Sequence, residues 1–213
     1  MVEIVGKAVG FFMHLDQYLN MIVQTYHSWT YVILFLIIFC ETGLVITPIL
    51  PGDSLIFVAG SFGGNGRLAL FGTFGLLMVA AILGNCVNYA LGNLLGMSVI
   101  SKGKIPFIRV EHVEKTHRYF EKYGALTLVI TRFLPIVRTI SPFMAGVGKM
   151  DYRRFMIFNV LGAVLWVSLF YWGGAFFGNL TFVQENFSMV IFAIIFLTVV
   201  PYIYQFLFSR RKM

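Results

Sequence analysis

Long runs of uncharged, mostly apolar residues dominate the pattern along the chain. Three of these runs are long enough to cross a lipid bilayer as a helix, which takes about 20 residues. They cover residues 68–101, 155–177 and 187–208. We therefore predict an all-α polytopic membrane protein with transmembrane helices at these three positions.

Two further apolar segments are interrupted by charges and prolines, so neither is expected to span the bilayer. Backbone that breaks at membrane depth is tolerated only where protein or a wet cavity covers it. We predict that residues 28–66 and 125–148 each form a re-entrant hairpin, which enters the membrane and returns on the same side. The residues expected to break the helices in these hairpins are Pro48, Pro51, Gly52, Pro135 and Pro142.

The remaining segments are more polar. In residues 1–27 apolar side chains recur at steps of three and four, interrupted by charges, which predicts an amphipathic helix lying in the membrane interface. Residues 102–124 form a polar loop or helix between the first span and the second hairpin. Together these elements make up a single membrane domain over residues 1–213.

The composition agrees with this class. Hydrophobic residues make up 59% of the chain and charged residues only 12%, whereas soluble domains have about 25% charged residues. Cys40 and Cys86 lie in apolar runs and are interpreted as small buried hydrophobes.

The sequence also lacks the patterns of several chemistries. His112 and His117 are five apart, which does not place two metal ligands on one helix face. There is neither a nucleophile–base arrangement nor a glycine-rich loop for a nucleotide phosphate. We therefore expect no enzyme activity, no cofactor, no metal and no nucleic-acid partner.

Basic residues predict the orientation in the membrane. Twelve of the sixteen lysines and arginines lie in residues 102–124, 149–154 and 210–212. Under the positive-inside rule these segments, and with them the C-terminus, are cytoplasmic. The two hairpins then enter the membrane from opposite faces.

A weak internal repeat agrees with opposed hairpins. Ala59-Gly60 and Ala145-Gly146 are 86 residues apart, and each pair closes a proline-broken segment. The long spans that follow end near Gly92 and Gly178, also 86 apart. Two halves of opposite orientation that meet at broken helices are typical of secondary transporters.

Four ionisable residues are predicted at membrane depth: Glu41, Asp53, Arg132 and Arg138. A charge at the bilayer centre costs about 2.5–3.5 kcal/mol on insertion scales, so these groups need partners or water. Acids in one hairpin and bases in the other suggest that the hairpins face each other. The alternatives are buried salt bridges that only clip the hairpins together and, for Asp53, an acid that favours a helix dipole.

The spacing of the two arginines points to an anion. Arg132 and Arg138 are six residues apart, about 240° around a continuous helix, so they share a pocket only if Pro135 breaks the helix between them. Two converging guanidinium groups repel each other unless an anion lies between them, and their geometry matches a phosphate. Ser141-Pro142 is interpreted as the N-cap and first turn of the returning helix, whose free N–H groups would face the same pocket, although Ser141 could simply cap the helix.

Other polar and aromatic residues are interpreted more simply. Glu41 follows thirteen uncharged residues, and a desolvated glutamate can take up a proton near neutral pH, which suits proton-coupled transport. Asn85 and Asn88 could line a cavity, but interhelical packing is the preferred interpretation. The tyrosines and tryptophans between 166 and 172 are interpreted as ordinary for a span.

Two segments carry a family resemblance. "FCETGLVITPILPGDSLIFVAG" and "TRFLPIVRTISPFMAG" resemble the two signature segments of the DedA family of membrane proteins, also called SNARE-associated or VTT-domain proteins. The resemblance covers roughly residues 30–178. The matching positions are Glu41, Gly43, Pro51, Gly52, Asp53, Arg132, Phe133, Pro135, Arg138, Thr139, Pro142, Ala145 and Gly146.

The resemblance implies paired re-entrant hairpins, an inner-membrane location and the movement of lipids across the bilayer. Bacterial members are implicated in returning undecaprenyl phosphate, the carrier of cell-wall synthesis, to the cytoplasmic leaflet, and some are linked to the proton motive force. On this basis the phosphate-binding residues would be Arg132, Arg138, Ser141 and Thr139, and the proton-coupling or gating residues would be Glu41 and Asp53.

Other functions fit the same sequence. A phospholipid scramblase without ion coupling, a proton-coupled antiporter of small cations and a non-transporting assembly factor are the alternatives. The sequence leaves open the exact lipid, the coupling ion, the stoichiometry and whether the chain forms a homo-oligomer.

Overall fold

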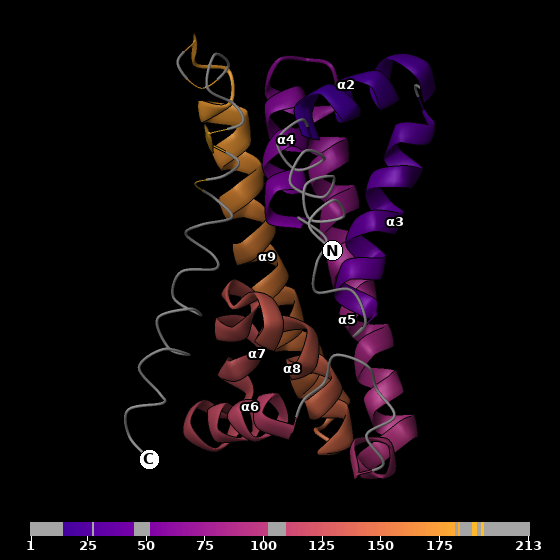
Figure 1. Cartoon of the computed structure of the whole chain (residues 1–213), viewed down its shortest axis with the longest axis vertical. Coiled ribbons are helices and arrows are strands. Elements are labelled where there is room, and N and C mark those ends of the chain that lie inside the picture. The colour runs from indigo at the N-terminus through magenta and orange to yellow at the C-terminus, as the bar shows by residue number, and fades with distance from the viewer. Residues whose placement is uncertain are drawn as a thin grey trace, which may run out of the picture. The chain divides into compact units, whose positions relative to one another are not determined.

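The computed structural model describes residues 15–26, 28–44, 52–101 and 110–181, with residues 183, 189, 190 and 193. Over these residues the chain is helical and contains no strand (Figure 1). The elements are α2 (Leu15–Tyr26), α3 (Trp29–Gly43), α4 (Gly52–Gly64), α5 (Leu70–Ser101), α6 (Val110–Tyr123), η1 (Gly124–Leu126), α7 (Thr127–Ile130), η2 (Thr131–Phe133), α8 (Pro135–Val147) and α9 (Tyr152–Phe177).

Two of the described helices are long and apolar enough to cross a membrane. They are Leu70–Leu95 within α5 and Tyr152–Phe177, which is α9; each has 26 residues, with mean hydropathies of 2.0 and 1.8. At 1.5 Å per residue each covers about 39 Å, more than the hydrocarbon core of about 30 Å. Both predicted spans are therefore confirmed as long apolar helices, and the third, 187–208, lies almost entirely outside the described residues.

The elements of the predicted hairpins are helical as expected. The first, 28–66, contains α3 and α4, and the chain between them, including Pro48 and Pro51, lies outside the described residues. The second, 125–148, contains α7, η2 and α8. The entry of the two hairpins from opposite membrane faces stays a prediction.

The polar segment before the second hairpin contains α6, and residues 102–109 lie outside the described part of the chain. The helix α6 packs against α8, where Phe120 contacts two apolar clusters that also contain Phe143 and Phe155. The N-terminal segment contains α2, with Leu19 buried, and α2 packs against α4.

The chain divides into two compact units, each of which draws on separate stretches of sequence. The first contains 1–34, 51–76 and 167–213, and the second contains 35–50 and 77–166. Three helices, α3, α5 and α9, contribute a segment to both units.

In the first unit α4 packs against the C-terminal part of α9 at glycine contacts. A Cβ atom at Gly60 would lie 2.0 Å from the carbonyl oxygen of Tyr171, and one at Gly174 would lie 1.9 Å from that of Phe57. Every residue of α4 from Gly52 to Gly63 is buried. Only glycine permits backbones to approach this closely, as at the small-residue interfaces of membrane helices.

In the second unit α8 packs against α5 in the same way. A Cβ atom at Gly146 would lie 2.1 Å from the carbonyl oxygen of Tyr89, and one at Gly92 would lie 2.0 Å from that of Phe143. Tyr89 also stacks on Phe155 of α9, with ring centroids 4.4 Å apart. These contacts fix α8, and with it the residues of the first turn of α8, against the long helix.

The two units therefore repeat one packing motif. Phe-x-Ala-Gly on α4 and again on α8 faces Tyr-x-x-Gly on α9 and on α5, respectively. The hairpin helices correspond at the predicted offset of 86 residues. The long helices correspond at an offset of 82 residues, because Gly92 occupies the position that Gly174 occupies in the other unit. The expected equivalence of Gly92 and Gly178 was therefore wrong by four residues, about one helical turn.

Candidate functional site

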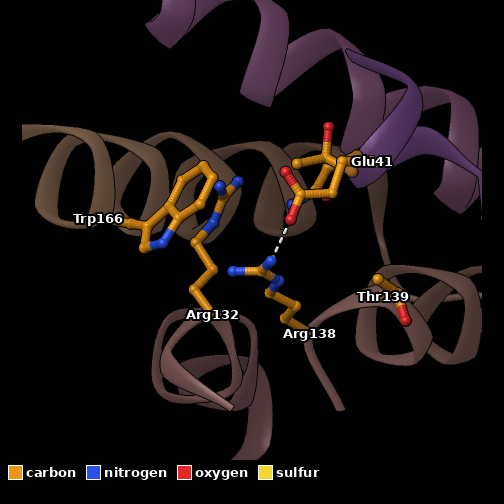
Figure 2. Close-up of a pocket in the computed structure, with 7 residues that line it drawn as sticks. Glu41, Arg132, Arg138, Thr139 and Trp166 are labelled. Carbon is orange, nitrogen blue, oxygen red and sulfur yellow. Dashed lines mark hydrogen bonds and ion pairs between the residues drawn. The ribbon is translucent and has the colours of Figure 1, made fainter. Parts of the chain in front are cut away.

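A buried ion pair joins the end of α3 to the start of α8. Glu41 is completely buried near the C-terminal end of α3. Arg138, in the first turn of α8, donates from Nη2 to Oε1 of Glu41, and its side chain is only 9% exposed (Figure 2). The structure thus brings together an acid and a base that are 97 residues apart and that the sequence predicted to face each other.

The chain breaks between the two arginines. Arg132 lies in η2, and Leu134 is extended, with φ −116° and ψ 102°. The helix α8 then begins at Pro135. A residue before proline is disfavoured in the helical region, which accounts for the extended Leu134. The predicted break at Pro135 is confirmed.

Both arginines line one cavity in the second unit. It is a small cavity, with free space of about 10 Å³, room for about one water molecule. Its lining residues are Glu41, Thr42, Asn85, Arg132, Arg138, Thr139 and Trp166. With Glu41 ionised, these side chains carry two positive charges and one negative charge. The cavity is therefore net cationic, which favours an anionic ligand.

Arg132 is held by an uncharged partner. Its Nη2 donates to the side-chain Oδ1 of Asn159 at 2.6 Å and to the backbone carbonyl of Asn159 at 3.3 Å. Asn159 lies on α9, is completely buried and was not recognised in the sequence. No carboxylate pairs with Arg132 within the described residues.

Trp166, also on α9, lies beside both guanidinium groups. The Cζ atoms of Arg132 and Arg138 are 5.9 Å and 5.4 Å from its ring, and the ring is buried (Figure 2). At these distances a tryptophan face attracts a cation. The interpretation of this tryptophan as ordinary for a span was wrong, because its ring is part of the cavity wall.

The two asparagines of α5 have different roles. Asn85 lines the cavity and donates to Oδ1 of Asn159 at 3.0 Å. Asn88 donates from Nδ2 to the backbone carbonyls of Thr42 at 3.1 Å and Thr139 at 2.7 Å. Asn88 thus connects α5 to both α3 and α8 and fixes the backbones that carry the ion pair, which is the interhelical bonding that the sequence favoured.

The predicted helix start at Ser141-Pro142 was wrong. Both residues lie inside α8, which begins six residues earlier at Pro135, and Ser141 is buried and is not among the residues that line the cavity. The chain breaks at Leu134, before Pro135, and α8 then continues through Pro142. A proline within a membrane helix is tolerated where neighbouring groups compensate for its missing N–H. Thr139 does line the cavity.

Asp53 belongs to the first unit. It lies in the first turn of α4, directly after Gly52, and is buried, with 8% of its surface exposed. This position is where an acid favours the helix dipole, as the sequence allowed. The predicted association of Asp53 with the arginines stays a prediction.

Two helices long and apolar enough to cross a bilayer and a buried cavity lined by charged side chains are typical of a helical membrane protein with a polar site. Residues 50–176 match the VTT domain. The chain belongs to the DedA family of membrane proteins, as the signature segments implied.

Relatives of known name match this chain over most of its length. The chain is 43% identical over 211 residues to Protein DedA of Escherichia coli (strain K12), covering 98% of this chain and 96% of that protein. It is 34% identical over 174 residues to Inner membrane protein YghB of the same strain, covering 82% and 78%. It is 35% identical over 165 residues to Uncharacterized membrane protein ML0287 of Mycobacterium leprae (strain TN), covering 78% and 74%. No solved structure matches the chain.

Proposed function

We propose that this protein moves undecaprenyl phosphate, or a closely related polyisoprenyl phosphate, from the outer to the cytoplasmic leaflet of the inner membrane. The observation that carries the proposal is the cavity with two arginines and one acid. Buried guanidinium groups on either side of a broken helix supply several N–H donors to one anion, and a phosphate accepts them with good geometry.

The ion pair between Glu41 and Arg138 allows the ligand to take the place of the carboxylate. In the empty site Glu41 satisfies the guanidinium of Arg138. A phosphate headgroup replaces the carboxylate at Arg138, and the displaced Glu41 takes up a proton because an unpaired, desolvated carboxylate is unstable in its charged form. Proton uptake by Glu41 couples headgroup binding to the proton gradient. The lipid tail stays in the bilayer while the headgroup crosses.

A purely structural ion pair is the main competing interpretation. Replacing a buried pair with apolar side chains is often neutral or stabilising, so a pair kept only for strength has little advantage. The position of the pair in the wall of a cavity that also holds a second arginine supports a binding role.

Binding and transport by the full-length protein test the proposal. Wild type in lipid nanodiscs should bind undecaprenyl phosphate, and Arg138→Ala should lose that binding while it elutes as a folded protein. Proteoliposomes with labelled undecaprenyl phosphate should show transport that increases with an imposed proton gradient. Equal movement of zwitterionic phospholipids, indifferent to the gradient, would instead indicate a scramblase.

The orientation is part of the same proposal. We place the C-terminus and the 102–124 segment in the cytoplasm, supported by the basic residues concentrated there. Membrane location itself is supported by the relatives, one of which is named an inner membrane protein. Fluorescence from a C-terminal green fluorescent protein fusion, which matures in the cytoplasm, is the expected result; a dark fusion with an active C-terminal alkaline phosphatase fusion would reverse the topology.

A further inference from the structure

The two arginines of the cavity are held by partners of different charge. Arg138 contacts the carboxylate of Glu41, whereas Arg132 contacts the neutral amide of Asn159. We propose that Asn159 is a positioning residue that holds Arg132 as a permanently charged anchor for the anion, while Arg138 is the group that exchanges its acid for the ligand. This inference rests on the proposed function, because it assigns separate roles to the two cationic groups of that site.

The hydrogen bonds of Asn159 fix its orientation. Its Nδ2 donates to the backbone carbonyl of Ile82 at 3.1 Å, and its Oδ1 accepts from Arg132 at 2.6 Å and from Asn85 at 3.0 Å. If the amide were flipped, its NH₂ group would face two other donors and its oxygen would face a carbonyl. The network therefore forces the amide oxygen toward Arg132.

The helix α9 is also shaped for the arginine. A Cβ atom at Gly162 would lie 2.9 Å from Nε and 3.0 Å from Cδ of Arg132, so the side chain of Arg132 lies against the backbone where α9 has no side chain. Trp166 faces the guanidinium one turn further on. Asn159, Gly162 and Trp166 are spaced by three and four residues and so share one face of α9.

The neutrality of residue 159 is the feature with functional meaning. A carboxylate at this position would make a stronger, charge-assisted bond to the guanidinium, but it would also cancel the charge of Arg132 in the empty site. With asparagine, the position of Arg132 is fixed and its charge is retained. Its other terminal nitrogen, Nη1, makes no hydrogen bond within the described residues, which leaves a donor for a ligand.

The test uses an isosteric change of charge. In full-length protein in nanodiscs, Asn159→Asp keeps the shape of the side chain and adds a carboxylate beside Arg132. We expect its affinity for undecaprenyl phosphate to fall by about 10- to 100-fold, the loss of one charge-assisted contact. The unfolding temperature should also fall, because the second carboxylate oxygen faces the carbonyl of Ile82, so the affinity is measured well below the unfolding transition. If the role of Asn159 were only structural, the folded variant would bind with the affinity of wild type.

A second variant moves Arg132 without touching Asn159. Gly162→Ala places a methyl group against Nε and Cδ of Arg132 and should lower the affinity by about 10-fold. The matched control is Gly173→Ala on the same helix, where the nearest atom would be 3.9 Å away and the affinity should stay within about twofold of wild type. This pair decides the question if Asn159→Asp does not fold.

The outcomes separate the two proposals. If wild type itself does not bind undecaprenyl phosphate, the proposed function fails. If wild type binds, Arg138→Ala does not, and both Asn159→Asp and Gly162→Ala bind like wild type, the proposed function stands and the role of Asn159 is refuted.

Discussion

The contact between α5 and α8 predicts that one added methyl group destabilises the protein. In Gly92→Ala the new Cβ would lie 2.0 Å from the carbonyl oxygen of Phe143, whereas real Cβ contacts are not closer than 3.0 Å. The two helices must therefore separate locally by about 1 Å. A gap of 0.5–1 Å forfeits about a quarter to a half of the dispersion energy of the atoms involved, and overpacking of this kind costs about 1–3 kcal/mol.

The expected effect is measurable as a shift in unfolding temperature. For a chain of this length each kcal/mol corresponds to about 2–4 °C, so the close contact should make Gly92→Ala unfold about 2–12 °C below an alanine variant of the same helix that lacks the contact. Gly75→Ala is the matched control, because it makes the same substitution in the same helix where no atom lies within 4 Å of the new Cβ. Alanine is favoured over glycine in a helix by about 1 kcal/mol, so this control should unfold at or slightly above the wild-type temperature.

The assay is thermal unfolding of purified protein in detergent, followed by the loss of the monodisperse peak in size-exclusion chromatography. Circular dichroism at 25 °C confirms that both variants have the wild-type helix content before heating. Unfolding temperatures of Gly92→Ala and Gly75→Ala within about 1 °C of each other would refute the close approach of α5 and α8.

Three further predictions concern the cavity and the helices that form it. Glu41→Gln and Arg138→Gln should each lower the free energy of unfolding by about 3 kcal/mol, because each variant leaves one buried partner of the ion pair uncompensated. The double variant should lose much less than the sum of the two single losses. Single losses that add up within about 0.5 kcal/mol in the double variant would contradict the ion pair. Asn88→Ala should lower the free energy of unfolding, measured with denaturant, by about 2 kcal/mol or more, because two buried carbonyls lose their donor. The control Asn93→Ala, at an exposed position of the same helix, should change this free energy by less than about 0.5 kcal/mol. Equal effects of the two substitutions would count against the bridging role of Asn88. Trp166→Leu should destabilise the protein by about 1 kcal/mol more than Trp166→Phe, which keeps an aromatic face beside the two guanidinium groups, and equal losses would mean that packing alone decides.

The sequence predicted those parts of the site that carry a charge or a proline. A charge in an apolar run is conspicuous because its burial is expensive, which singled out Glu41, Arg132 and Arg138. The break at Pro135 followed from the geometry of a proline and of the residue before it. The long spans followed from their uncharged length alone.

The α9 side of the site could not be predicted in the same way. Asn159, Gly162 and Trp166 are uncharged and lie in a span that reads as continuous, so nothing in their burial is costly enough to attract attention. Their spacing of three and four residues was the available signal, but such spacing is also common in ordinary packing. Ser141-Pro142 misled for the opposite reason, since a strong local helix-start pattern lies within a helix that other contacts maintain.

The repeated glycine contacts have a consequence for synthesis of the chain. Each half contributes one short glycine-bearing helix and one long helix, and the short helix of each half packs on the long helix of the other: α4 on α9, and α8 on α5. The ribosome makes Phe57 more than 100 residues before Tyr171. At a synthesis rate of about 5–20 residues per second, roughly 6–23 s pass between the synthesis of α4 and that of the surface of α9 that covers it. Neither half, expressed as a separate polypeptide, contains its own partner surface, so stable accumulation requires both halves in the same membrane.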